Sequence, residues 1–165
     1  MLEILIFSDS HGNVSPMKKA IMAHPSAKYV LFCGDGLRDI ELLEACFPQR
    51  IFLSVKGNCD FFLSADALTE RTFTLGGLSI LLTHGHLFGV KGSYGVAASH
   101  AYAVGADLLI FGHTHIPYEG RMPVKDKTVH LFNPGSIGKS NGGAYSYGML
   151  TIGDNGYLFS HGSVT

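Results

Sequence analysis

Seven polar side chains of the kinds that bind metals stand at five places along this chain of 165 residues. They lie in the segments SDSHGN, CGDG, KGNCD, LTHGH and FGHTH, and nearly every segment directly follows an apolar run. Such runs are typical of buried strands, and strand ends gather at one edge of a sheet, so side chains far apart in sequence can meet there. The expected metal ligands are Asp9, His11, Asp35, Asn58, His84, His113 and His115.

Strands and helices alternate in the first third of the chain. Apolar runs predict strands at residues 2–7, 29–33 and 51–55, and helices fit residues 15–24 and 37–47. Pro16 suits the first turn of the first of these helices. This order predicts a parallel sheet with helices packed on its faces.

The later part of the chain is richer in strands that short turns join. Residues 71–75 and 78–83 are typical of a hairpin, and residues 108–111, 128–132, 147–152 and 157–160 are strand-like. A helix is expected at residues 94–104, and residues 61–69 resemble an irregular surface loop. The pattern predicts a second sheet, mixed or antiparallel, packed on the first. Because no long linker divides the chain, we expect one domain over residues 1–165.

Composition excludes several classes of protein. Apolar residues make up 46% of the chain and charged residues 15%, which indicates a compact, heavily buried fold. The formal net charge of −1 argues against general nucleic-acid binding. No apolar run approaches the roughly 20 residues that span a bilayer, and the first residues lack the pattern of a signal peptide. Three cysteines without a C-x-x-C pair fit free thiols, so we expect a cytoplasmic protein.

The chemistry of the seven side chains favours a site for two divalent cations. Asp9 and His11 are two residues apart, so in extended backbone both would face one ion, and His113 and His115 repeat this spacing. Asp35 has two carboxylate oxygens that can bridge two cations. Carboxylates, imidazoles and one amide carbonyl, without paired thiolates, are ligands that suit such a dinuclear site.

Each motif alone has a plainer interpretation. Asp9 with His11 could form a turn, Gly-Asp is a common turn pair, and a lone histidine is more often structural than a ligand. The order of all five motifs, each after a predicted strand, favours the metal site. Four other histidines are expected to be structural or to face solvent: His24, His100, His130 and His161. His86 is a candidate outer-sphere group or substrate contact, because it stands two residues after His84.

Two further patterns point to other classes of protein. Residues 138–142 match the G-x-S-x-G pattern of serine hydrolases, and residues 133–140 are one residue short of a P-loop. Both patterns require a helix to follow them. A strand-like segment follows here instead, so a serine hydrolase and a nucleotide-binding switch are remote alternatives.

The motifs together resemble the calcineurin-like metallophosphoesterases. That family carries, in order, D-x-H, G-D, G-N-H-(D/E), H and G-H-x-H. This chain matches the pattern over about residues 1–138, and its segments GNCD, THGH and NPGS are similar to those of the small phosphodiesterase branch. The resemblance implies an α/β fold, a four-layer α/β/β/α sandwich with two mixed sheets and a dinuclear site at the sheet edge.

The resemblance also implies how the ligands divide. One metal is expected to take Asp9, His11, Asp35 and His115. The other is expected to take Asp35, Asn58, His84 and His113, with Asp35 bridging. Manganese is the expected metal, and iron, zinc or nickel suit the same ligands. The activity implied is hydrolysis of phosphate diesters through a hydroxide that bridges the two metals.

One departure from the family pattern bears on catalysis. Larger family members have a histidine after the motif asparagine, where it can protonate the leaving group, and this chain has Cys59. We therefore expect a preference for leaving groups that need little protonation, unless His86 or a water supplies the proton. The alternative function is a catalytically weak, metal-binding scaffold for protein–protein interaction, because a retromer subunit with this fold also lacks that histidine. The expected partner is a small phosphodiester substrate, and a homo-oligomer is compatible with the low charge content.

Overall fold

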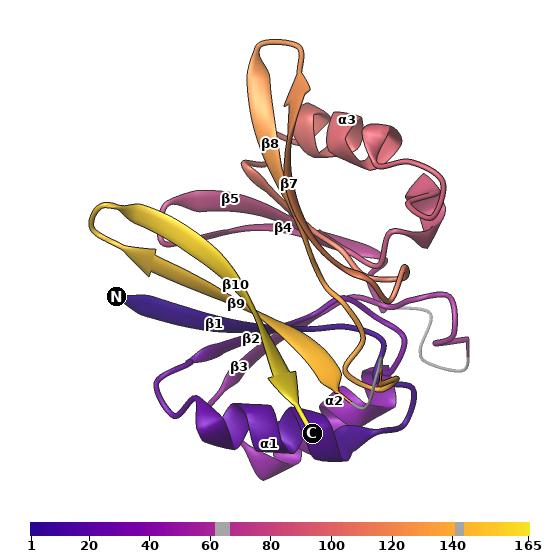
Figure 1. The fold of residues 1–165 in the computed structure, drawn as a ribbon, viewed down its shortest axis with the longest axis vertical. Helices are drawn as coiled ribbons and strands as arrows, with labels where there is room; N and C mark the ends of the chain where they lie inside the picture. The colour runs from indigo at the N-terminus through magenta and orange to yellow at the C-terminus, as the bar shows by residue number, and fades with distance from the viewer. Residues whose placement is uncertain (62–66, 141–143) are drawn as a thin grey trace.

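The computed structural model describes residues 1–61, 67–140 and 144–165. A first sheet has the strand order β10-β9-β1-β2-β3 (Figure 1). Its strands are β1 (Leu2–Phe7), β2 (Tyr29–Phe32), β3 (Ile51–Ser54), β9 (Tyr145–Gly153) and β10 (Gly156–Val164). β1, β2 and β3 are parallel, as the alternation of strands and helices predicts, and β9 and β10 add an antiparallel pair.

A second sheet has the order β4-β5-β6-β8-β7. Its strands are β4 (Glu70–Leu75), β5 (Leu78–Thr83), β6 (Leu108–Ile110), β7 (Pro117–Val124) and β8 (Lys127–Pro134). β4 and β5 form the predicted hairpin, and β5, β6 and β8 are parallel. Both sheets are mixed, which confirms the predicted architecture.

Strand β7 was not predicted from the sequence. Pro117, Gly120 and Pro123 lie within it, and these residue types argue against a strand. Among the described strands, β7 lies at the sheet edge and pairs with β8 alone, so the missing N–H groups of its prolines need no partner on the other side. Only the tertiary position of the strand makes such a sequence tolerable.

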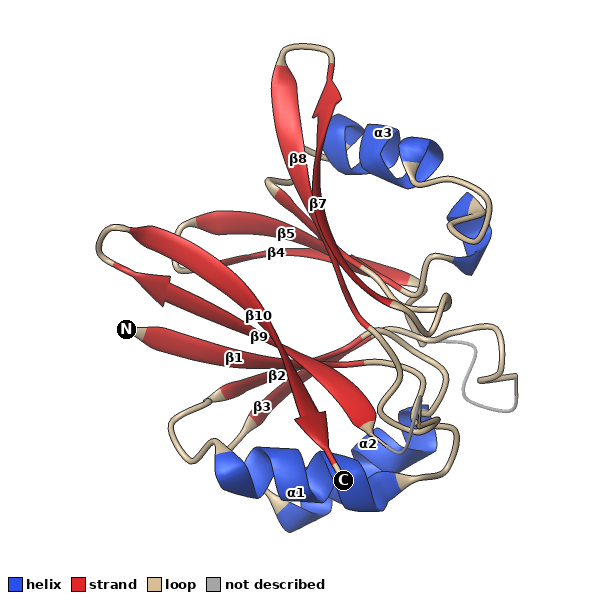
Figure 2. Ribbon diagram, viewed as in Figure 1, coloured by secondary structure: helices blue, strands red, loops and turns tan. Residues whose placement is uncertain are grey.

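The layers are visible in Figure 2, where helices α1 (Val14–Ala23) and α2 (Leu37–Cys46) cover the first sheet and α3 (Gly95–Ala103) covers the second. Side chains alternate along β1: Ile4 and Ile6 pack between the sheets, and Leu5 and Phe7 pack beneath the helices. The core between the sheets also contains Phe132 of β8. The result is the expected α/β/β/α sandwich.

Two expectations concern segments that are only partly described. The predicted loop at residues 61–69 includes residues 62–66, and the serine-hydrolase pattern includes residues 141–142; these lie outside the described residues. β9 follows the latter segment, so the strand that argued against a serine hydrolase and a P-loop is confirmed. No helix in the described ranges is both long and apolar enough to cross a membrane.

Candidate metal centre

The loops that follow β1, β2, β3, β5 and β6 meet at one edge of the sandwich (Figure 1). In each sheet these strands are parallel, so their carboxyl ends point the same way. The seven predicted side chains lie on these loops. Contacts between them, described below, place all seven in one cluster.

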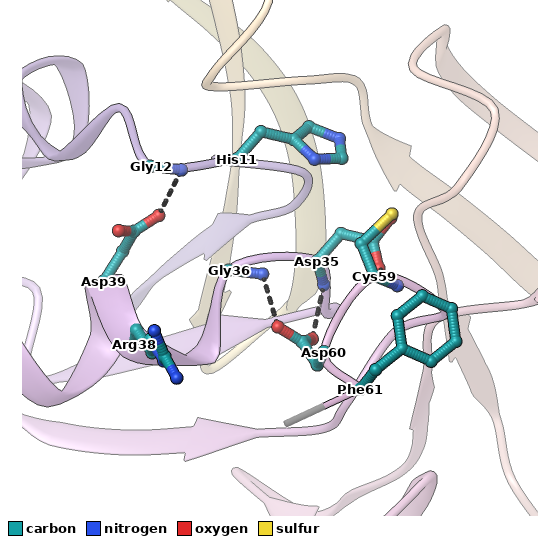
Figure 3. Close-up of a pocket in the computed structure, with 9 residues that line it drawn as sticks. All are labelled: His11, Gly12, Asp35, Gly36, Arg38, Asp39, Cys59, Asp60 and Phe61. Atoms are coloured by element: carbon teal, nitrogen blue, oxygen red, sulfur yellow. Dashed lines mark hydrogen bonds between the residues drawn. The ribbon is translucent and has the colours of Figure 1, made fainter. Parts of the chain in front are cut away.

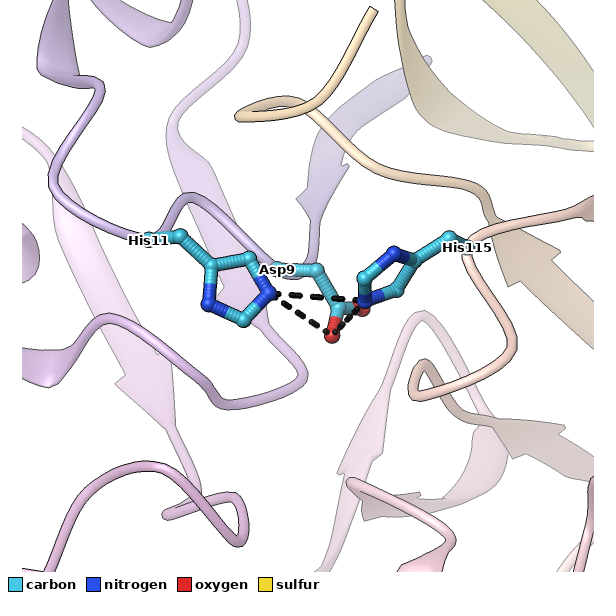
Figure 4. Close-up of side chains that lie close together, drawn as sticks. All are labelled: Asp9, His11 and His115. Carbon is cyan, nitrogen blue, oxygen red and sulfur yellow. Dashed lines mark hydrogen bonds and ion pairs between the residues drawn. The ribbon is translucent and has the colours of Figure 1, made fainter. Parts of the chain in front are cut away.

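Asp9 is the centre of one group, which Figure 4 shows. Its Oδ1 atom lies 3.1 Å from Nε2 of His115 and 3.8 Å from Nε2 of His11. The two imidazole nitrogens are 3.4 Å apart. The other carboxylate oxygen, Oδ2, accepts hydrogen bonds from the Ser8 hydroxyl and, at 3.1 Å, from the backbone N–H of His113. Asp9 is therefore held through one oxygen and presents the other to the imidazoles.

His84 is the centre of the second group. Its Nε2 atom lies 3.0 Å from Oδ1 of Asn58, 3.2 Å from Nδ1 of His113 and 3.4 Å from Oδ2 of Asp35. The opposite nitrogen, Nδ1, lies 2.7 Å from the carbonyl oxygen of Cys33, which fits a donated hydrogen bond. Such a bond fixes the tautomer and leaves Nε2 free to bind a metal.

The arrangement fits bound cations. Atoms that share a cation at about 2.1 Å stand roughly 3.0–3.4 Å apart, which is the spacing between most of these side chains. The Oδ1 atom of Asp9 is buried and has no hydrogen-bond partner among the described residues. A buried carboxylate oxygen without a partner is energetically costly, and a cation would satisfy it.

The backbone of the ligand loops differs from what the sequence analysis assumed. Asp9 and His11 have φ angles of 55° and 47°, and His113 and His115 have 69° and 61°. The two pairs thus converge through left-handed turns, and the assumption of extended backbone was wrong. Asp35 also has a positive φ, of 61°. Strained conformations of this kind cluster at functional sites, where surrounding contacts over-determine them.

A glycine permits the closest approach between two loops. A Cβ atom on Gly57 would lie 2.1 Å from Oδ1 of Asp35 and 2.6 Å from its backbone nitrogen. The loops that carry Asp35 and Asn58 therefore meet only because residue 57 has no side chain.

Electrostatics favour an ionised Asp35. Burial opposes its ionisation, but the contact with His84 and the hydrogen bond from the N–H of Cys59 outweigh this and hold the pKa of Asp35 well below its usual range. Burial likewise opposes a charge on His84, and the carboxylates of Asp35 and Asp9 nevertheless raise its pKa. Burial, together with the charge of His84, lowers the pKa of His113 to about 4.

A cavity of about 320 Å³ opens beside the cluster (Figure 3). His11 and Asp35 belong to its lining, and so do Cys59, Arg38 and Phe61. Burial and the nearby Asp35 carboxylate raise the pKa of Cys59 to about 11, so its thiol is protonated at neutral pH. The cavity is therefore lined by two of the proposed metal ligands, the guanidinium group of Arg38 and the aromatic ring of Phe61.

His86 lies beside the cluster at the start of the short helix η1 (His86–Phe88). Its ring centroid is 5.3 Å from that of His84 and 6.1 Å from that of His113. Burial lowers the pKa of His86, which favours the neutral imidazole. The position suits an outer-sphere role.

The remaining histidines have partners away from the cluster. The contacts are His24 with Tyr147, His100 with Glu70, His130 with Glu119, and His161 with the carbonyl of Asn133. These contacts agree with the structural roles that the sequence predicts for them.

The NPGS segment supports the ligand loops from behind. Asn133 donates to the carbonyl of Gly112 at 2.9 Å and to the Thr114 hydroxyl at 3.1 Å. The Ser136 hydroxyl donates to the carbonyl of Asp9 at 2.9 Å. The motif thus connects the loop of His113 and His115 with the loop of Asp9.

Two buried acids that were not predicted from the sequence, Asp39 and Asp60, accept hydrogen bonds from the backbone of the ligand loops. Asp60 ends the GNCD segment, so the family pattern contained a signal for it. Asp39 had no sequence signal of its own.

Residues 2–155 match the calcineurin-like phosphoesterase superfamily domain. This chain belongs to that family. It is 36% identical over 138 residues to the probable metallophosphoesterase YsnB of Bacillus subtilis, across 82% of this chain and 75% of that protein. It is 28% identical to the phosphodiesterase YfcE of Escherichia coli K12, across 91% and 88% of the two chains. These matches confirm the predicted family and the predicted enzyme class, a metal-dependent phosphoester hydrolase.

Solved structures share the fold. A protein of Streptococcus pneumoniae described as a predicted phosphoesterase superimposes with a TM-score of 0.74 at 25% identity, across 99% of this chain and 98% of that one. Vps29 of Entamoeba histolytica in complex with Zn²⁺ gives a TM-score of 0.72 at 21% identity, with coverage of 99% and 98%. At that identity the second likeness shows the fold alone.

Proposed function

We propose that this chain hydrolyses phosphate diesters with two divalent cations bound at the candidate metal centre. The observation that carries the proposal is the buried Oδ1 of Asp9, which faces two imidazoles and has no hydrogen-bond partner in the described part of the chain. We define a first subsite as Asp9, His11, Asp35 and His115. We define a second subsite as Asp35, Asn58, His84 and His113.

Hydrogen bonds hold the metal-binding atoms of the two subsites in fixed positions. Asp35 accepts the Cys59 N–H at 2.7 Å through Oδ1 and directs Oδ2 towards His84, so its carboxylate is oriented before any cation binds. Two bound cations supply Lewis acidity that activates water and offsets the charge that develops on a phosphate ester. Manganese is the metal we expect, and iron, zinc or nickel fit the same nitrogen and oxygen ligands.

The cavity beside the centre is the proposed place for the rest of the substrate. Its volume of about 320 Å³ suits a small molecule. Arg38 is exposed and has no ion-pair partner among the described residues, so its guanidinium is available for an anionic group. Phe61 is 78% exposed and offers a ring face to an apolar substituent.

Among the described residues, the proposed site has no strong general acid. The Cys59 thiol has a pKa of about 11, and burial lowers the pKa of His86. Neither group is matched to proton donation near neutral pH, where an acid is most effective with a pKa near the working pH. Substrates with good leaving groups should therefore react best, and we propose His86 as a substrate contact.

The test is hydrolysis of monoester and diester aryl phosphates by metal-free protein reloaded with manganese, iron, zinc or nickel. We expect two cations per chain by elemental analysis and faster turnover of diesters than of monoesters. A stoichiometry that never exceeds one would contradict the dinuclear site. Absence of hydrolysis with all four metals would contradict the proposed phosphodiesterase activity.

One observation favours a second function, a metal-binding scaffold for another protein. Three apolar side chains directly follow ligand segments and are exposed: Phe61 at 78%, Leu87 at 63% and Ile116 at 64%. Exposed apolar side chains on the loops beside a binding site can contribute to contacts with another protein. Failure of the hydrolysis assay with two cations bound would favour this function.

Location and assembly are further parts of the proposal. The three cysteines are free thiols, as expected of a protein in the reducing cytoplasm. The two sheets share one core, which supports a single domain over residues 1–165. A homo-oligomer remains compatible with the low charge content, and sedimentation would measure it.

A further inference from the structure

Two buried carboxylates outside the ligand set each hold a different loop of the metal centre. Asp60 follows β3, and Asp39 lies in the first turn of α2. Their exposed fractions are 9% and 6%. Both line the cavity beside the centre, yet the hydrogen bonds of their carboxylates run to the chain itself.

Asp60 accepts four backbone N–H groups. Oδ2 accepts from Asp35 and Gly57, each at 2.8 Å, and Oδ1 accepts from Gly36 at 2.9 Å and Leu37 at 3.0 Å. A carboxylate has about four lone-pair sites, so no site remains for a cation. Asp60 is therefore a connector: it joins the loop of Asp35 to the residue that precedes Asn58.

Asp39 holds the loop of the first ligand pair. Its Oδ2 accepts the Ser10 hydroxyl at 2.5 Å and the Gly12 N–H at 2.9 Å. Ser10 lies between Asp9 and His11, and both of these ligands have left-handed backbone. A charge-assisted hydrogen bond on each side of His11 fixes the turn that makes the pair converge.

We propose that Asp60 positions the second subsite and Asp39 positions the first, each largely independently of the other. The proposal rests on the metal centre proposed above. The two carboxylates hold different loops, and the only ligand that both subsites share is Asp35. Each acid restrains strained turns before a cation arrives, so that the donors need little reorganisation when it binds.

The substitutions Asp60→Asn and Asp39→Asn test this with little change in shape. An asparagine turns one acceptor oxygen into an NH₂ donor. At position 60 that donor faces two backbone N–H groups, and at position 39 it either faces the Gly12 N–H or leaves a neutral acceptor there. Asp60→Glu is the companion variant that keeps charge and acceptors and changes only the reach.

The experiment measures manganese affinity by calorimetry in backgrounds that keep one subsite. His115→Ala leaves the second subsite and His113→Ala leaves the first. Asp60→Asn should weaken manganese binding about 10–100-fold in the His115→Ala background, the range found for residues that orient ligands. It should have a smaller effect in the His113→Ala background, where only Asp35 is affected. Asp39→Asn should give the reverse order.

Amide hydrogen exchange of the metal-free protein is the second readout. Asp60→Asn should speed exchange at residues 35–37 and 57, and Asp39→Asn should speed it at residue 12. Equal losses of affinity in both backgrounds, or faster exchange along the whole chain, would overturn the positioning roles and leave general destabilisation. If Asp60→Asn does not fold, Asp60→Glu must show the same preference for the second subsite, or the proposal is wrong. Wild-type protein that binds fewer than two manganese ions would instead contradict the metal centre.

Discussion

The two sheets bring different chemistry to the proposed metal centre. The first sheet supplies every oxygen donor and one imidazole: Asp9, Asp35, Asn58 and His11. The second sheet supplies imidazoles alone: His84, His113 and His115. The buried carboxylates Asp39 and Asp60 hold loops of the first sheet, and the neutral Asn133 holds the loop of His113 and His115 in the second.

This difference predicts how the two halves of the centre, the ligand loops of the first sheet and those of the second, depend on bound cations. Buried carboxylates accumulate in the half that the first sheet provides, and like charges in a poorly solvated place destabilise each other. The half from the second sheet carries no carboxylate among its ligands. Bound cations should therefore matter most for the loops of the first sheet, and the following predictions test that contrast from the largest expected effect to the smallest.

The largest effect should come from Asp35→Asn, because Asp35 belongs to both subsites. We expect loss of affinity at both and a fall in kcat/KM of roughly 10³-fold, at the upper end of what one electrostatic group contributes. His115→Ala, in the second-sheet half, should damage mainly the first subsite. Metal titration of each variant measures this, and Asp35→Asn that binds two cations as tightly as wild type would show that Asp35 does not bridge.

Removal of the cations should destabilise the first-sheet loops more than the second-sheet loops. A bound cation whose free concentration is 100 times its Kd stabilises the fold by about 2.7 kcal/mol. Chelation should therefore lower the Tm by roughly 5–10 °C, given about 2–4 °C per kcal/mol at this chain length. Hydrogen exchange after chelation should rise first at residues 9–12 and 35–37. Uniform protection changes in both halves would contradict the contrast.

Asn133→Ala should affect the second-sheet half in particular. The substitution removes the partner of the Gly112 carbonyl and of the Gly135 N–H, and buried groups left without partners cost about 1–3 kcal/mol. Urea unfolding should show this loss of stability. Calorimetry should show weaker metal binding when Asn133→Ala is added to either single-subsite protein, His113→Ala or His115→Ala. Asn155→Ala, at an exposed turn, is the control and should change neither quantity.

Cys59→His should have the smallest effect, because it adds a group and removes no ligand. We expect kcat/KM to rise about tenfold for poor leaving groups, less than the 10²–10⁴-fold of an established general acid. Good leaving groups should gain little. The measurement is a series of aryl phosphate diesters with graded leaving-group pKa, and Cys59→Ser separates the imidazole from mere loss of the thiol. A wild-type rate independent of the leaving group would mean that protonation is supplied elsewhere.

The sequence by itself determined the residues of the candidate centre and the edge at which they meet. Asp35 and His113 each follow a short apolar strand, and local periodicity is enough to find such strands. The ends of parallel strands then have to lie at one edge of their sheet. The hairpin of β4 and β5 was also predictable from local sequence, as two strand-like runs joined by Gly76 and Gly77. Both glycines adopt the left-handed backbone that the turn requires.

Only the tertiary structure decided how the ligands point and what holds them. Asp39 reaches back 29 residues to Ser10, and Asp60 reaches back 25 residues to the N–H of Asp35. Strand β7 exists because an edge position tolerates its prolines. Local sequence encodes propensity and period, whereas these contacts depend on which loops the packed sheets bring together, and that is settled only when the whole core forms.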